Sequence, residues 1–93
     1  MIRVHVSGHL KDYTGRKRDF EMPYSNNVGE LVGQLNKMFP GIKERIFDDQ
    51  DKTRPYVNIF VNGENLRDIG NEGTTLKDGA IVNILPSVAG GLN

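Results

Sequence analysis

Apolar and polar side chains alternate along two short segments at the start of the chain. Residues 1–7 and 17–22 both follow the alternation, and Pro23 ends the second segment. A period of two residues predicts strands with one face toward a core and the other toward solvent. We expect these strands to form a hairpin with a loose turn, joined by a polar connection over residues 8–15.

A helical period replaces the alternation after Asn27. Apolar residues recur three or four positions apart at Val28, Leu31, Val32, Leu35 and Phe39. This spacing predicts an amphipathic helix with one buried stripe. Asn27 can cap its first turn, Glu30 can reach back as in a capping box, and the Pro-Gly pair at 40–41 ends it. Ile42 and Ile46 are expected to continue the apolar cover as a short irregular turn.

The strongest strand signal of the chain lies at residues 56–61, after a charged segment at 47–55 that we interpret as a solvated loop. Asn62-Gly63 is a typical hairpin turn. It predicts a short return strand over residues 64–67.

Residues 68–75 are interpreted as a loop or a single helical turn, and a last strand is expected over residues 80–85 before Pro86. The complete order is strand, strand, helix, strand, strand, strand. This order predicts an α+β fold in which one main helix packs on one face of a mixed sheet of four to five strands. That arrangement is the β-grasp, or ubiquitin-like, pattern.

Composition narrows the classes of function. The chain has 93 residues, with 12 Lys and Arg against 12 Asp and Glu, and it contains no cysteine. Zero net charge argues against an extended nucleic-acid surface. The lack of cysteine excludes disulfides, Cys-ligated metal centres and a thiol nucleophile.

No metal site is expected, because His5 and His9 lie on a strand and its following loop rather than on one helix face. No apolar run approaches the ~20 residues that span a bilayer, and the N-terminus has no signal-peptide pattern. We therefore expect a cytoplasmic protein with neither a membrane nor a nucleic-acid partner, monomeric when free.

The residues after Pro86 carry the chemical signal. They are Ser87, Val88, Ala89, Gly90, Gly91, Leu92 and Asn93. Small residues and a Gly-Gly pair keep the backbone slim and flexible. Such a segment is either an ordinary frayed end or a tail that threads a narrow channel and presents a carboxylate to another enzyme. We divide the chain into a β-grasp domain over residues 1–86 and a flexible tail over residues 87–93.

The ending from Asp78-Gly79 through Pro86 to Gly91 resembles that of the ubiquitin-like sulfur-carrier proteins. This family includes the thiamin sulfur carrier, the small subunit of molybdopterin synthase, and carriers for cysteine or homocysteine synthesis. The segments Val57–Glu64 and Leu10–Gly15 are also similar to the family, so the resemblance covers essentially the whole chain. It is most similar to the carriers for amino-acid or thiocarboxylate-metabolite synthesis.

The resemblance implies a protein co-substrate rather than an enzyme, with no catalytic residue and no bound cofactor of its own. A ubiquitin-activating-type adenylating enzyme would use ATP to join the Gly91 carboxylate to AMP. A persulfide sulfur would then displace AMP and leave a thiocarboxylate, which a sulfurtransferase or sulfhydrylase partner uses in biosynthesis of cysteine, homocysteine, methionine or a thiocarboxylate metabolite. Residues Ser87, Val88, Ala89 and Gly90 would thread the partner's channel.

Leu92 and Asn93 depart from the simplest form of the family. Because they follow Gly91, its carbonyl is held in an amide and cannot be adenylated. Some members carry such extra residues, which a zinc-dependent metalloprotease of the deubiquitinase type removes. We expect Leu92-Asn93 to be removed in this way; a cloning remnant is the alternative.

Strand alternation also predicts a docking face. If the alternate residues of Val57–Val61 face the helix, Phe60 lies on the opposite face of the sheet, together with Ile81 and Leu85 of the last strand. These strands are neighbours in a β-grasp sheet. We expect the three side chains to form an exposed apolar patch that docks partner enzymes.

Several alternatives to a carrier for amino-acid synthesis stay open at this point. The chain could instead be the small subunit of molybdopterin synthase, or a ubiquitin-like modifier conjugated to lysines through Gly91. A noncovalent interaction module with an accidental Gly-Gly pair is the last alternative.

Overall fold

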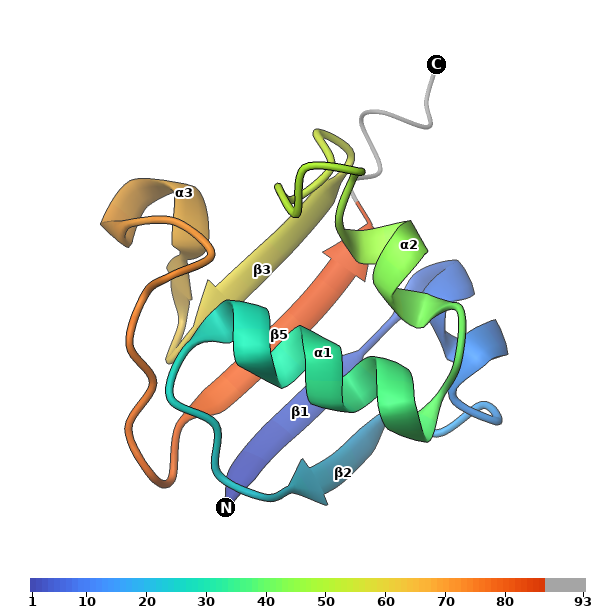
Figure 1. Ribbon diagram of the computed structural model, residues 1–93. Helices are drawn as coiled ribbons and strands as arrows, with labels where there is room; N and C mark the ends of the chain where they lie inside the picture. Colours follow the sequence, from blue (N-terminus) through green and yellow to red (C-terminus); the bar gives the residue numbers. More distant parts are fainter. Residues whose placement is uncertain (87–93) are drawn as a thin grey trace.

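The computed structural model describes residues 1–86, which form a five-stranded sheet with helices packed on one face (Figure 1). The strands are β1 (Ile2–Val6), β2 (Asp19–Met22), β3 (Val57–Val61), β4 (Glu64–Asn65) and β5 (Ile81–Pro86). The helices are the 3-10 helix η1 (Gly8–Tyr13) and the α-helices α1 (Val28–Met38), α2 (Ile42–Ile46) and α3 (Leu66–Ile69). The predicted α+β class with one main helix is confirmed.

The last strand in the sequence is the central strand of the sheet. The spatial order is β2-β1-β5-β3-β4. Strand β5 runs parallel to β1 and antiparallel to β3, whereas the β1–β2 and β3–β4 pairs are antiparallel. The sheet is therefore mixed, as predicted.

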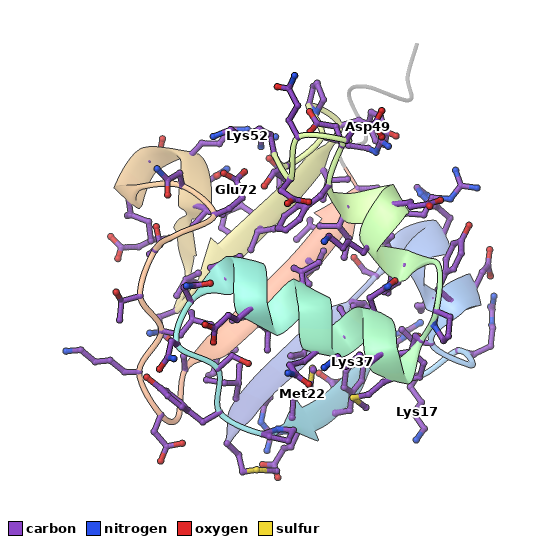
Figure 2. All side chains as sticks on the ribbon, in the orientation of Figure 1. Lys17, Met22, Lys37, Asp49, Lys52 and Glu72 are labelled. Atoms are coloured by element: carbon purple, nitrogen blue, oxygen red, sulfur yellow. The ribbon has the colours of Figure 1, made fainter. Side chains whose placement is uncertain are left out.

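The core lies between the sheet and the helices α1 and α2. The predicted stripe of α1 is buried at Val28, Leu31, Val32 and Leu35, and Figure 2 shows Met22 of β2 beneath this helix. At the end of the stripe, Phe39 is half-buried and packs edge-on against Phe20 with 5.5 Å between the ring centroids. The alternating residues of β1, β3 and β5 supply the opposite wall.

Two side-chain hydrogen bonds hold the start of α1 around the predicted N-cap, Asn27. The Asn27 side chain accepts a hydrogen bond from the Glu30 N–H over 2.8 Å. The Glu30 carboxylate accepts from the N–H of Asn26 over 3.1 Å, one residue before the position that a capping box would use. The first contact satisfies one of the N–H groups that a helix start leaves without partners, and the second ties the Glu30 side chain to the residue before the cap.

Residues 8–15 connect the antiparallel strands β1 and β2 as predicted, but the connection is not purely polar and most of it forms η1. Leu10 is fully buried in the core, and Thr14 is buried as well. The Thr14 hydroxyl donates to the Lys17 carbonyl over 2.7 Å, which satisfies its buried oxygen. A single apolar residue in a polar segment gives no periodic signal, so the sequence could not reveal this contribution to the core.

Other local expectations also need correction. Ile42 and Ile46 belong to the regular helix α2, and Phe47, expected in a solvated loop, is only 2% exposed. The return strand ends at Asn65, because the next residues form α3 with Leu66 in the core. The Asn65 side chain accepts from the Arg67 N–H over 3.0 Å and caps this short helix.

We expect Gly33→Ala to stabilise the protein by about 1 kcal/mol, because alanine has a higher helix propensity than glycine in a helix interior. A Cβ atom at Gly33 would meet no atom within 4 Å, whereas one at Gly29 would lie 3.4 Å from the Glu72 carbonyl oxygen. Gly29→Ala is the matched control and should gain less. Urea unfolding of both variants measures the difference; a destabilised Gly33→Ala protein would contradict the open surface at this position.

Candidate functional site

The C-terminal end of β5 is held on both sides by neighbouring strands. In the register of β3 and β5, Pro86 pairs with Val57. On the other side, the Ser7 N–H just after β1 donates to the Ile84 carbonyl over 3.2 Å. The point from which the chain continues beyond Pro86 is therefore fixed by the sheet, at the end of β5 marked by its arrowhead in Figure 1.

The start of η1 packs directly against Pro86. A Cβ atom at Gly8 would lie 2.6 Å from Cγ of the proline ring, and Gly8 has a φ of +62°. Only glycine combines this left-handed backbone with such a close approach at low cost. Gly8 therefore lets η1 close against the end of β5.

The loop that precedes β3 lies at the same end of the molecule, where Figure 2 shows Asp49 and Lys52. Asp48 organises this loop by accepting from the Gln50 and Lys52 N–H groups over 2.8 and 3.1 Å. The backbone N–H groups of Lys52 and Gln50 hold the pKa of Asp48 below its usual value. The ionised carboxylate is thus part of the turn.

Glu72 ties this loop to the segment after α3. Its carboxylate accepts from both the N–H and the hydroxyl of Thr53 over 2.7 Å. Partial burial would raise the pKa of Glu72, but the two donors of Thr53 outweigh it and the pKa lies below its ordinary value. A charged acceptor with two donors therefore holds the loop before β3 against the segment after α3.

The three predicted docking residues lie together on the face of the sheet opposite α1. Ile81 is 46% exposed, and Phe60 and Leu85 are half-buried. Phe60 pairs directly with Asn83, so Ile81 and Leu85 are its diagonal neighbours along β5. We call Phe60, Ile81, Asn83 and Leu85 the open-face patch. Its role in docking stays a prediction.

The half of this face formed by β1 and β2 is charged rather than apolar. Arg3 donates to Glu21 over 3.2 Å, and Nδ1 of His5 lies 2.7 Å from the Asp19 carboxylate. Both pairs join residues that are direct partners in the register of β1 and β2. Exposed pairs of this kind contribute little stability, but they leave the carboxylates of Glu21 and Asp19 each paired with a side chain of β1.

No sequence motif singles out Arg67, yet the fold brings it to the edge of the open-face patch. Its guanidinium donates to the Asn58 side-chain oxygen and to the Arg54 carbonyl, each over 2.8 Å. Asn58 pairs with Leu85 in the sheet. These partners lie 9 and 13 residues away in the chain, so no local pattern could have indicated the contact.

Two of the expected absences can be examined within residues 1–86. No group of three or more His, Asp or Glu side chains there is placed to hold a metal ion. None of the helices in this range has both the length and the apolar character needed to cross a membrane.

The expectations for the tail fall outside the described residues. These are the sulfur attachment at Gly91, the threading residues Ser87, Val88, Ala89 and Gly90, and the processed residues Leu92 and Asn93. They stay predictions.

Comparison with known proteins gives consistent results. The pattern of the ThiS family matches residues 4–91. Sulfur carrier protein CysO of Mycobacterium tuberculosis H37Rv is 34% identical over 92 residues, covering 97% of this chain and 98% of that protein. The molybdopterin synthase sulfur carrier subunit of Emericella nidulans is 30% identical over 92 residues, with 97% of each chain covered.

A chain in the crystal structure of the Amycolatopsis orientalis BexX/CysO complex superimposes with a TM-score of 0.88 at 31% identity. The match covers 98% of this chain and 100% of that one. The predicted β-grasp fold is therefore confirmed.

Replacing Gly8 should destabilise the protein more than replacing Gly15. Both have φ values near the left-handed region, at +62° and +64°, but a Cβ atom at Gly15 would meet nothing within 4 Å. Gly15→Ala should cost about 1–2 kcal/mol of backbone strain. Gly8→Ala should cost a further 1–3 kcal/mol or so, because its methyl group overlaps Pro86. Urea unfolding of the two variants compares them, and equal losses would argue against a close contact between η1 and β5.

Proposed function

Because the chain belongs to the ThiS family, we propose that it is a sulfur carrier protein that delivers sulfur from its Gly91 carboxyl end in cysteine synthesis. The observation that carries this proposal is the family match, which spans the folded domain and runs to Gly91 itself. The full-length similarity to CysO favours cysteine as the product.

The chemistry of the tail requires activation by another protein. A carboxylate is a poor acyl donor, whereas its mixed anhydride with AMP is a good one. In the proposed cycle, the Gly91 carboxylate attacks the α-phosphate of ATP in the adenylating enzyme, and pyrophosphate leaves. A persulfide sulfur then attacks the acyl carbon and releases AMP, and a thiol reductant cleaves the sulfur–sulfur bond to leave the thiocarboxylate.

The carrier's own contribution is to bind the partner enzyme and to position the Gly91 carboxylate. The open-face patch and the base of the tail share strand β5, so a partner docked on Phe60, Ile81 and Leu85 is held at a fixed place relative to Pro86. From Pro86, an extended chain brings Gly91 at most about 18 Å further. Docking therefore limits where the reactive carboxylate can be presented.

Leu92 and Asn93 lie beyond the family match. We propose that a zinc-dependent metalloprotease removes them, because adenylation needs a free carboxylate at Gly91. The protein then acts in the cytoplasm as a co-substrate and not as an enzyme, with ATP bound by the activating partner. A sulfhydrylase or sulfurtransferase would take the sulfur.

A molybdopterin synthase subunit is the second candidate function. Similarity to the Emericella nidulans subunit supports this function. The match covers 97% of this chain, at 30% identity against 34% for CysO. In that function the same tail would donate its sulfur within a large catalytic subunit. The two candidates share activation at Gly91 and differ in the acceptor.

Mass spectrometry tests the activation of Gly91. The chain ending at Gly91, incubated with the adenylating enzyme of the same organism, ATP and a persulfide donor, should gain the mass of one oxygen replaced by sulfur. The 93-residue chain should not gain it until the protease has removed Leu92-Asn93.

Deletion of Gly90–Asn93 serves as the control and should abolish the mass gain while leaving the folded domain intact. Thiocarboxylate formation on the unprocessed chain would refute the processing step. Failure of the chain ending at Gly91 to react would refute the carrier function. Transfer of the sulfur to an activated serine derivative, rather than to a pterin precursor, separates the two candidates.

Phe60→Asp should reduce adenylation at least about tenfold, because a carboxylate in the docking interface would be buried without a partner. The side chain lies on the open face and outside the buried core, so thermal unfolding should change little. Pyrophosphate release measures adenylation. Wild-type turnover by this variant would refute docking through the open-face patch.

A further inference from the structure

Arg67 is held in one position while its positive charge stays exposed. Two neutral acceptors, the Asn58 side chain and the Arg54 carbonyl, each take one hydrogen bond from the guanidinium. Within residues 1–86 no carboxylate lies within 4 Å of it, in contrast to Arg3, which pairs with Glu21. A guanidinium fixed in this way has already lost side-chain entropy and keeps further N–H donors for a planar anion.

The charges around the open-face patch are distributed unevenly. On this face the carboxylates of β2, Asp19 and Glu21, are already engaged by His5 and Arg3 of β1. The outward residues of β3 and β5 are apolar or amide side chains, bordered by Arg67. Arg67 therefore places a fixed positive charge at the border of this half of the face, where it complements a carboxylate of a partner.

Asn83 adds a polar group at the centre of the open-face patch. It pairs with Phe60 on β3 and with His5 on β1, and it is flanked along β5 by Ile81 and Leu85. Within the described residues its side-chain amide makes no hydrogen bond, although it is partly exposed. A partner that covers the patch must either pair with this amide or bear the cost of burying it unpaired.

Resting on the proposed function, we infer that Arg67 and Asn83 determine which adenylating enzyme the carrier accepts. The complementary partner surface is apolar opposite Phe60, Ile81 and Leu85. It carries an Asp or Glu carboxylate opposite Arg67 and a hydrogen-bonding group opposite Asn83. The apolar side chains supply contact area, and the two polar groups supply specificity, because a mismatched surface would leave them buried without partners.

The experiment measures kcat/KM for adenylation of the chain ending at Gly91, by pyrophosphate release with the adenylating enzyme of the same organism. Arg67→Gln should lower kcat/KM roughly 10- to 100-fold, mainly through KM, since hydrogen bonds to charged groups are worth that factor. Added salt should lower kcat/KM by a larger factor for the unmodified chain than for this variant. Arg67→Lys, which keeps the charge without the fixed fork, should lie between them.

Arg3→Gln is the matched control, because Arg3 lies on the same face but is already paired with Glu21. It should change kcat/KM less than about threefold. Thermal unfolding of each variant checks that α3 and the sheet remain folded. An Arg67→Gln protein that stays folded and behaves like the control would overturn the role of Arg67.

Whether Asn83→Leu raises or lowers kcat/KM tests the role of Asn83. If the partner hydrogen-bonds Asn83, leucine lowers kcat/KM; if the partner surface there is purely apolar, leucine raises it and the role of Asn83 is wrong. Loss of adenylation in Phe60→Asp alone, with both polar variants unaffected, would leave the carrier function standing and reject this inference. No adenylation of the unmodified chain would reject the carrier function and the inference with it.

Discussion

The pairing of β5 on both of its edges is the constraint on which the rest of the structure depends. One edge is bonded to β1 and the other to β3, so the strand has no free backbone at the sheet edge. Its inward residues Val82 and Ile84 are fully buried under the helices, while Ile81 and Leu85 face outward. One strand therefore carries core packing, the open-face patch and the base of the tail in a single rigid segment.

This sharing explains how the chain could act as a co-substrate in the proposed group-transfer chemistry. In the proposed cycle the sheet fixes position, the open-face patch supplies contact area for the partner, and the segment beyond Pro86 supplies the carboxyl group. None of these parts needs special chemistry, because the proposed role depends on the fixed distance between the open-face patch and Pro86 along β5. Gly8 belongs to the same arrangement, because its lack of a side chain lets η1 close against Pro86.

The regular elements could be predicted from sequence because their signals are periodic and local. The stripe of α1, the alternation in β3 and the turn at Asn62-Gly63 are each set by residues close together in the chain, and the structure confirms them. Leu10 was missed as a core residue because a single apolar residue between polar ones has no period, and Phe47 because a run of charged residues follows it. The position of Arg67 depends on contacts between α3, β3 and the preceding loop, which only the tertiary fold brings together.

The central place of β5 also bears on how the protein is made. Of the five strands described, β5 leaves the ribosome last, and until it emerges no strand joins the β1–β2 pair to the β3–β4 pair. A chain that stops short of β5 thus lacks the middle of its sheet, three of the four residues of its open-face patch and its tail together. A chain that ends before β5 would therefore stay unfolded, so the sheet can form only after synthesis has reached Pro86.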